Sequence, residues 1–353
     1  MNSIELKKAL KMLKSATDGV SFQDRIVYME FVPAEPDFLA YLKLSIQGSM
    51  SRGEVTVFTD KIKKEGTCYA DLDILYKIVS GCNEQELSLS IDDNKQLLIV
   101  KYGRSRFKIA HIEHSQTEIN QEFKDEREVN PKKIVEATRQ IAAYCDPTSS
   151  YETLKGFFLT EDICCMGNSF RVVASKSNPF EEDFFIYYNT IEFLQQISGV
   201  CYFSSNDNFI TFFSDNFSFI FDINRTMEAP QIRSFLDLPM IDSLEVPFEQ
   251  LKSLASSISI VNGEDIVLES DGKSLKFECQ GINSDFKSAL DAKFKKTFKW
   301  NLNSHMFKEA IRVIGMNAEK DEGVKIELFE EVNDPCIVLT SGNFVQILST
   351  KNE

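Results

Sequence analysis

The sequence predicts an α+β protein made of three tandem copies of one domain with mostly antiparallel sheets. Its 353 residues exceed the roughly 150 residues of one ordinary domain, and 43% of them are hydrophobic. Similar helical segments end at Gly81, Gly199 and Gly315, so they recur 118 and 116 residues apart. This period indicates repeated domains, which we expect at residues 1–125, 126–243 and 244–353.

Each copy is expected to begin with a long amphipathic helix, because apolar residues follow helical spacing there. The three segments are residues 3–16, 131–144 and 247–260. Proline at the start of the second and third suits a first helical turn.

A shorter helix follows in each copy, at residues 71–81, 189–199 and 304–316. Asp71, Asn189 and Ser304 are suited to cap the free N–H groups of its first turn. The closing glycines suit a left-handed residue at the helix end.

A β-hairpin is expected to close each copy, since β-branched and aromatic residues flank a short turn. The turns lie at Gly103, at Asp215 and Asn216, and at Gly342. Further strand-like runs occur at residues 41–47, 53–59, 156–167, 170–175 and 265–270. Polar junctions at residues 113–129 and 235–247 separate the copies.

The distribution of charge separates the helices from the rest of the chain. The net charge of −15 and the pI of about 4.9 exclude a protein that coats nucleic acid with its whole surface. The six expected helices nevertheless carry +4, which leaves −19 elsewhere. A localised basic face therefore remains possible.

Cationic residues recur on one face of these helices. Lys7, Lys11 and Lys14 share a face of the first helix, with Lys8 beside them. Lys132 with Arg139, and Lys308 with Arg312, repeat the pattern in the other copies. Two interpretations stay open: a solvated helix face, or a surface that meets phosphates.

Several classes of function find no support. The eight cysteines form no C-x-x-C pair, so we expect buried thiols in a reducing cytoplasm, not zinc or disulfides. No apolar run could span a membrane or act as a signal peptide. Phosphate-binding and nucleophile-elbow motifs are missing from the sequence.

A hydrolase built on repeated domains is the rival from another class, and it would need clustered polar groups. The candidates are Asp71, Asp73, His111 and His114. Helix capping explains the two aspartates better, and the histidines have no third ligand at a matching spacing. We therefore expect no enzyme, no metal and no cofactor.

Residues 69–112 resemble the end of the first domain of the bacterial DNA polymerase III beta subunit, the sliding-clamp family. Gly103, Arg104, Ser105, Arg106 and Phe107 stand in the order found in that family's hairpin turn. The segments KKIVEATRQIAAY and GNSFRVVAS of the second copy are also similar to the family, whereas the third copy matches by layout. The chain ends in ILSTKNE, unlike the family's usual tail, as in a divergent or phage-encoded member.

The resemblance implies a head-to-tail homodimer that closes into a ring of six domains, with helices lining the hole. Such a ring encircles double-stranded DNA without reading its sequence, tethers a DNA polymerase and is opened by a separate clamp loader. It works in the cytoplasm of a bacterium, or of the host of a phage. The alternative is a clamp-like ring that serves mainly transcription, repair or recombination partners.

The resemblance also implies site residues. The DNA-binding set is Lys7, Lys8, Lys11, Lys14, Arg25, Lys77, Lys132, Lys133, Arg139, Tyr151, Lys252, Lys308 and Arg312. The partner-peptide cleft would comprise Leu154, Phe170, Arg171, Val172, Leu238, Pro239, Met240, Ile347 and Leu348. The dimer interface would bring Ile78, Phe107 and Ile109 against an edge strand with Ser274, Leu275 and Phe277.

Overall fold

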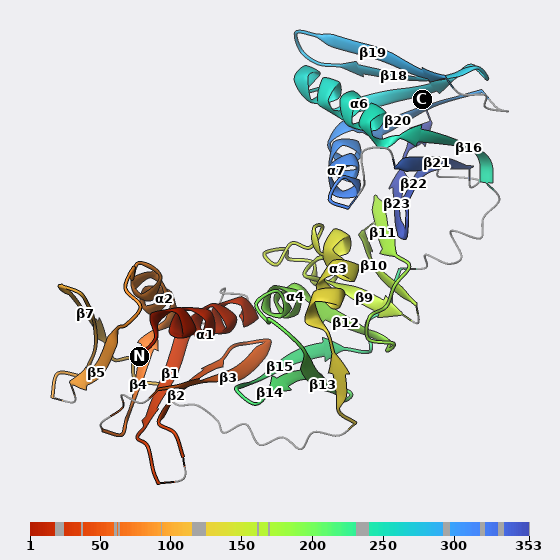
Figure 1. Cartoon of the computed structure of the whole chain (residues 1–353). Coiled ribbons are helices and arrows are strands. Elements are labelled where there is room, and N and C mark those ends of the chain that lie inside the picture. Colours follow the sequence, from red (N-terminus) through yellow and green to blue (C-terminus); the bar gives the residue numbers. More distant parts are fainter. Residues whose placement is uncertain are drawn as a thin grey trace. The chain divides into compact units, whose positions relative to one another are not determined.

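The computed structural model describes residues 1–17, 25–36, 38–59, 62, 64–92, 94–114, 125–160, 162–168, 170–230, 240–291, 297–317, 322–330 and 335–352. The chain divides into two compact units (Figure 1). Unit 1 comprises Met1–Glu136 and Phe185–Arg225, and unit 2 comprises Ala137–Phe184 and Thr226–Glu353. The described part contains six α-helices and antiparallel sheets, which confirms the predicted fold class.

One order of elements occurs three times: a long helix, four strands, a shorter helix and three strands. The first copy has α1 (Ser3–Ala16), β1 (Ile26–Val32), β2 (Tyr41–Gln47), β3 (Ser51–Phe58), β4 (Gly66–Asp71), α2 (Leu72–Ser80), β5 (Ser88–Asp92), β6 (Leu97–Tyr102) and β7 (Ser105–Ala110). The second has α3 (Pro131–Ala142), β9 (Gly156–Thr160), β10 (Ile163–Asn168), β11 (Arg171–Ser175), β12 (Phe184–Tyr187), α4 (Tyr188–Leu194), β13 (Cys201–Ser205), β14 (Phe209–Ser214) and β15 (Phe217–Asn224). The third has α6 (Phe248–Val261), β17 (Asp265–Ser270), β18 (Ser274–Gln280), β19 (Asp285–Asp291), β20 (Phe298–Asn303), α7 (Ser304–Ile314), β21 (Gly323–Glu330), β22 (Pro335–Ser341) and β23 (Phe344–Ser349).

Four further elements of the described residues lie outside this order: β8 (Arg127–Val129), the 3-10 helix η2 (Glu152–Leu154), β16 (Met240–Pro247) and β24 (Lys351–Asn352). The order of elements confirms the predicted threefold repeat. The boundaries of the three predicted domains stay a prediction, because the division into two units runs through the second copy.

Unit 1 is built on an antiparallel sheet in the order β4-β1-β2-β3-β15-β14-β13-β8. The centre of this sheet joins two copies, because β3 of the first pairs with β15 of the second. Their register runs from Ser51 opposite Phe221 to Val55 opposite Phe217. A separate small sheet has the order β5-β6-β7.

Unit 2 repeats this arrangement with the next pair of copies. Its larger sheet has the order β16-β21-β22-β23-β11-β10-β9, and β11 of the second copy pairs with β23 of the third. The register runs from Arg171 opposite Leu348 to Ser175 opposite Phe344. The second sheet has the order β19-β18-β17-β20-β24.

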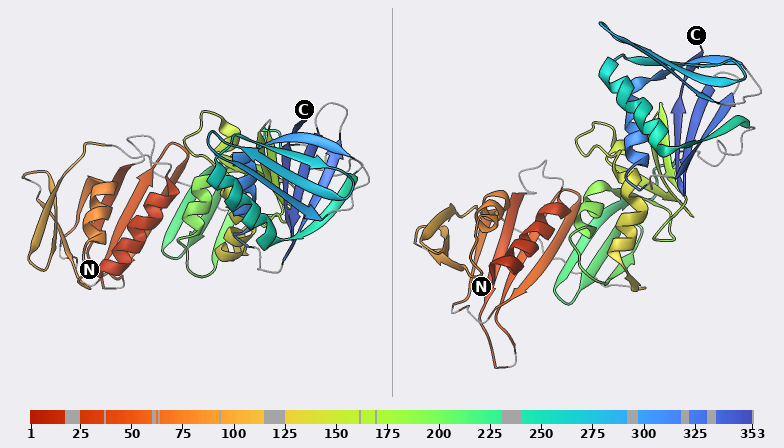
Figure 2. Two further views of the ribbon diagram at one scale, coloured as in Figure 1. Left: turned by 90° about the horizontal axis from the view of Figure 1, so that it is seen from above. Right: turned by 45° about the horizontal axis from the view of Figure 1, so that its top comes forward.

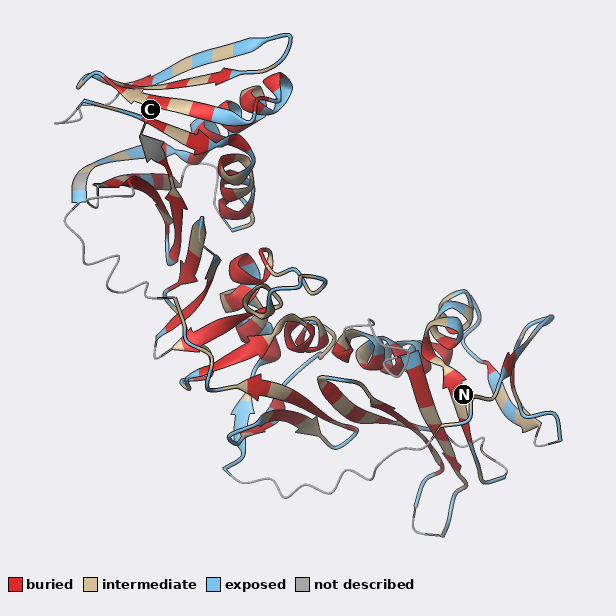
Figure 3. Ribbon diagram, turned by 180° about the vertical axis from the view of Figure 1, so that it is seen from behind, coloured by how far each residue is buried: buried red, intermediate tan, exposed pale blue. Residues whose placement is uncertain are grey.

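The helices cover one face of the sheets and bury their apolar side there. In unit 1, α1 lies across β2 and β3 (Figure 2), and its leucines Leu6, Leu10 and Leu13 are completely buried. Along β3, buried positions alternate with less buried ones, and β2 alternates likewise except at the buried Ser45, as in a sheet with one covered face (Figure 3). In unit 2, α6 and α7 pack against each other.

Of the three residues predicted to cap the shorter helices, one does so in the structure. The Asp71 carboxylate accepts a hydrogen bond from the N–H of Ile74 at 2.8 Å, as predicted. The predicted cap Asn189 is wrong, because α4 starts one residue earlier and the buried Asn189 amide donates to the carbonyl of Ala16. Ser304 is also not the cap, since Asn303 takes that role and Ser304 donates to the carbonyl of Gly263.

The predicted left-handed glycines are wrong at two helix ends. Gly81 and Gly315 have φ of −79° and −64°, so both continue the right-handed helical turn. A left-handed helix end occurs instead at Asn262, with φ of 53°. The hairpin turns agree with prediction, and Gly103 and Gly342 have the positive φ values of 53° and 54° that such turns favour.

Candidate nucleic-acid interface

The first cationic surface lies on α1. This helix turns its apolar side to the sheet and exposes Lys7, Lys8, Lys11 and Lys14. Lys14 forms an ion pair with Asp73 of α2, which offsets part of its charge. Within the described part of the chain, the other three lysines form no ion pair. They are therefore available to an anionic ligand.

The second and third helices add further exposed cations. The predicted residues here are Lys77 on α2 and Lys132, Lys133 and Arg139 on α3, and all four are exposed. Arg25 is exposed just before β1, and Tyr151 is exposed just before η2. α4 carries no lysine or arginine, so it adds no cation to this surface.

Three predicted cations converge on a groove between α6 and α7. Lys252, Lys308 and Arg312 line this groove, which has a volume of about 600 Å³, together with His305 and Glu309. Lys252 is paired with Glu249 at 3.2 Å, and Arg312 lies 4.0 Å from Glu309. The cations outnumber the acids along the groove, so it suits a polyanion.

The predicted cleft residues on β11 and β23 lie on opposite faces of one sheet. Arg171 reaches Glu309 of α7, at 2.5 Å between Nη1 and Oε2, so its side chain lies on the face that α7 covers. Gln346 donates to the carbonyl of Ala310, also in α7, which places the fully buried Leu348 on the same face because strand side chains alternate. These two residues therefore do not lie in one cleft with their neighbours.

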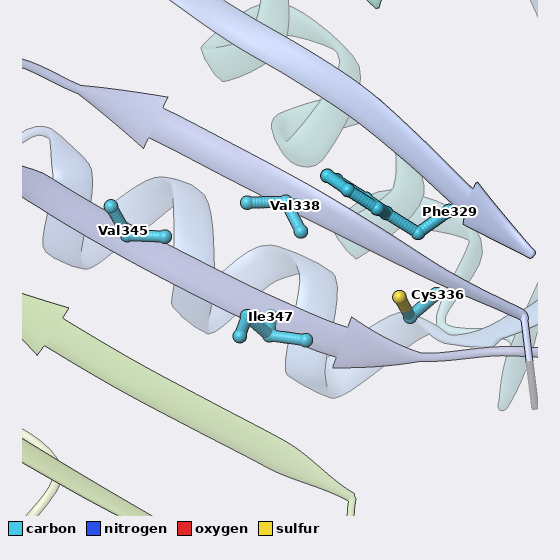
Figure 4. Packing of buried hydrophobic residues seen from close by; sticks show 5 residues of the cluster. All are labelled: Phe329, Cys336, Val338, Val345 and Ile347. Carbon is cyan, nitrogen blue, oxygen red and sulfur yellow. The ribbon is translucent and has the colours of Figure 1, made fainter. Parts of the chain in front are cut away.

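Val172 and Ile347 are opposite each other in the register and belong to the other face. There they join an apolar cluster on β21, β22 and β23 (Figure 4) formed by Phe329, Cys336, Val338, Val345 and Ile347. Each of the five is at most 6% exposed. Of the residues predicted for the cleft, Val172 and Ile347 thus belong to this cluster, and the cleft itself stays a prediction.

The remaining cleft residues have different positions. Phe170 precedes β11 and is 62% exposed, and Met240 begins β16 and is 45% exposed. Leu154 lies half-buried in η2, against β9 and β10. Leu238 and Pro239 lie outside the described residues.

The predicted dimer interface has one side at a free sheet edge. Among the described strands, β7 pairs with β6 alone, and its Phe107 is half-buried, stacked 5.6 Å from the ring of Tyr102. Ile109 is buried on the same strand, and α2, which carries the half-buried Ile78, packs against it. The three residues thus come together at β7, an edge strand of its sheet in the described part of the chain.

On the other side, the expected edge strand is wrong. β18, which contains Ser274, Leu275 and Phe277, pairs with both β17 and β19, and its apolar residues are buried. Among the described strands, β19 forms the edge of this sheet next to β18, and the short β24 forms the opposite edge.

Two exposed isoleucines near β19 were not predicted. Ile260 ends α6 and is 83% exposed, and Ile282 precedes β19 and is 99% exposed. Ile260 departs from the helical spacing of the buried Leu251, Leu254 and Ile258, and that departure was the available signal.

The side chains considered for a hydrolase site form structural contacts instead. Asp71 caps α2, Asp73 pairs with Lys14, and His111 Nδ1 accepts a hydrogen bond from the N–H of Tyr69 at 3.2 Å. No cluster of three metal-binding side chains occurs among the described residues. The eight cysteines are free thiols. None of the helices in the described part is long and apolar enough to cross a membrane.

Three copies of one helix-and-sheet unit, joined through shared sheets and carrying cations on their helices, define the class of beta-clamp folds. Solved structures agree. The DNA polymerase III beta subunit of Thermotoga maritima matches with a TM-score of 0.82 and 13% identity, over 100% of this chain and 98% of that one. That of Pseudomonas aeruginosa gives 0.80 and 13%, over 100% and 99%.

The beta clamp of Helicobacter pylori, bound to a DNA ligase peptide, gives a TM-score of 0.74 and 18% identity, over 99% of this chain and 98% of that one. No family model and no curated protein sequence matches the chain. The chain thus has the fold of the DNA polymerase III beta subunit along its whole length.

Proposed function

We propose that this protein is a DNA sliding clamp, a non-catalytic processivity factor that encircles duplex DNA as a closed homodimer. It tethers a replicative DNA polymerase and other DNA-processing proteins, and a separate loader opens it. The observation that carries the proposal is the way each copy of the repeat joins the next. A protein with this role works in the cytoplasm.

Neighbouring copies of the repeat pair through the same two strands each time, and one strand of each kind remains at a sheet edge. The last strand of one copy pairs with the third strand of the copy before it, as β15 does with β3 and β23 with β11. In the part of the chain that the structure describes, the equivalent strands without such a partner are β7 and β19, which are both sheet edges. The same pairing between two molecules would join β7 of each to β19 of the other.

This contact is heterologous, and two such contacts close a ring of six copies with no free end. The charges at the two edges are complementary. Arg106 and Lys108 are exposed along β7, with Arg104 just before it. Asp285 and Asp291 are exposed at the ends of β19, and Lys287 between them is paired with Glu278. The exposed Ile260 and Ile282 beside β19 would be buried by such a contact. The domains 1–125, 126–243 and 244–353 are then the three sectors of each subunit.

DNA would pass along the cationic helix faces. Lysine and arginine contacts to phosphates carry no sequence information, and each is weak and exchangeable. A ring held by such contacts can slide, because its retention depends on closure and not on affinity. The acidic remainder of the chain would repel DNA from other surfaces.

Partner proteins would dock through short apolar peptides. The support is the apolar cluster with Val172 and Ile347, together with the exposed Phe170 and Met240 nearby in the chain's second and third copies. A fold relative, the H. pylori clamp, is bound to a DNA ligase peptide.

A duplex with biotin at both ends tests encirclement without a loader. Protein added before streptavidin can thread over the free ends, and the streptavidin blocks then trap it when salt weakens the phosphate contacts. Protein added after streptavidin cannot thread, so high salt should remove it. Equal retention in both orders of addition would contradict the proposal.

A further inference from the structure

An acidic residue sits among the cations of the α6/α7 groove. Glu309 lies on α7 between Lys308 and Arg312, and it is the only acid among the described residues that line the groove. Its Oε1 is 4.0 Å from Nη2 of Arg312. If Glu309 had no other partner, its carboxylate would neutralise the charge of Arg312, which would then be lost for binding DNA phosphates.

Arg171 gives Glu309 a closer partner on the other side. Arg171 Nη1 lies 2.5 Å from Glu309 Oε2, whereas Arg312 Nη2 lies 4.0 Å from Glu309 Oε1. The Arg171 side chain is 17% exposed and Arg312 58%, so the Arg171 pair is less screened by water and salt. Glu309 therefore pairs more strongly with Arg171 than with Arg312.

A buried network fixes Arg171 in this position. Its guanidinium lies 4.0 Å from the centre of the Tyr144 ring, a cation–π contact. The Tyr144 hydroxyl donates to Gln346 Oε1 at 2.5 Å, and Gln346 Nε2 donates to the carbonyl of Ala310 at 2.9 Å. The network thus ties Arg171 to the same helix that carries Glu309.

We propose that Arg171 is a positioning residue for DNA binding, which holds the Glu309 carboxylate so that Lys308 and Arg312 remain free for phosphates. The proposal rests on the proposed clamp function. It gives Arg171 a role on the α7 face of its strand, in place of the peptide-cleft role that the sequence predicted.

Binding of the full chain to a short DNA duplex, followed over a series of salt concentrations, tests this role. Arg171→Gln should free Glu309 to pair with Arg312, and one phosphate contact should be lost. The slope of log affinity against log salt should then fall by about 0.9, as in Arg312→Gln. Adding Glu309→Gln to Arg171→Gln should restore the slope, which a merely structural role of Arg171 would not do.

Three outcomes would overturn the proposal. If Arg171→Gln binds like the wild type while Arg312→Gln loses a contact, Arg171 has no such role and the clamp function stands. If the wild type does not bind duplex at low salt, both proposals fail. If Arg171→Gln does not fold, the single variant Glu309→Gln tests the proposal. Unchanged DNA binding supports the idea that Arg171 already keeps Glu309 from neutralising Arg312. A slope of log affinity against log salt that is larger by about 0.9 contradicts it.

Discussion

At the scale of single residues, the neighbours of a charged group determine how much of its charge is available to a ligand such as DNA. Lys14 shares its charge with Asp73, and Glu309 is shared between Arg171 and Arg312. Helical spacing alone predicted that the lysines are exposed, because the apolar residues of a helix fix its buried side. It could not predict the pair of Arg171 and Glu309, which are 138 residues apart in the sequence.

Glu192 on α4 gives a prediction about pH. Burial raises the pKa of its carboxyl, although a hydrogen bond from Tyr188 acts in the opposite sense. Between the pKa of the unfolded chain and the higher pKa of the folded protein, the folded protein binds more protons. Its free energy of unfolding therefore falls as the pH rises through that window.

Glu192→Gln should accordingly stabilise the protein at neutral pH, by only about 0.5 kcal/mol since the side chain keeps part of its hydration. The gain should shrink as the pH falls through the window. Thermal unfolding at several pH values measures it, with the exposed Glu136→Gln as control. A gain that is the same at every pH would contradict the role of burial.

At the scale of elements, strand pairing positions the copies of the repeat, and the packing there is tight. Gly53 of β3 is opposite Phe219 of β15, and a Cβ at Gly53 would overlap the Phe219 ring. The sequence predicted the strands and hairpins, since alternation and turn residues are local signals. Their partners in other copies could not be predicted this way, because pairing between distant strands leaves no local signal.

Gly53→Ala should destabilise unit 1 by about 2 kcal/mol, because the added methyl group overpacks the contact with Phe219. Chemical denaturation of the full chain measures the change in the free energy of unfolding. Ser218→Ala, at a half-buried position of the same strand pair, is the control and should change it little. Equal effects of the two substitutions would show that Gly53 has no special packing role.

Reversing Lys7, Lys11 and Lys14 to glutamate should weaken duplex binding. Loss of three phosphate contacts lowers the slope of log affinity against log salt by about 2.7. The matched control reverses Lys95, Lys176 and Lys273, which are exposed on connections between strands. If both variants lose binding equally, net charge alone is responsible and α1 is not part of the interface.

At the scale of the whole molecule, the threefold repeat was the most predictable property, because similar segments recur along the sequence at nearly constant spacing. One strand of the predicted seam was misplaced. The alternation of Leu275 and Phe277 shows that one face of β18 is buried, but it does not distinguish an interior strand from an edge. Because β19 and not β18 is the edge strand, the proposed contact between subunits uses β19.

Phe107→Asp should convert the dimer to monomers, because a carboxylate would be buried against the neighbouring subunit at the β7 edge. Sedimentation at several concentrations gives the mass. Phe38→Asp replaces a 70% exposed phenylalanine in the loop between β1 and β2 and should leave the dimer intact. A dimeric Phe107→Asp variant would mean that the seam lies elsewhere.

The proposed function depends on closure into a ring, which negative-stain electron microscopy of the purified protein makes visible. We expect six-lobed rings with a hole wide enough for duplex DNA, at the mass of two chains. Monomers or open filaments at high protein concentration, with no closed rings, would contradict it.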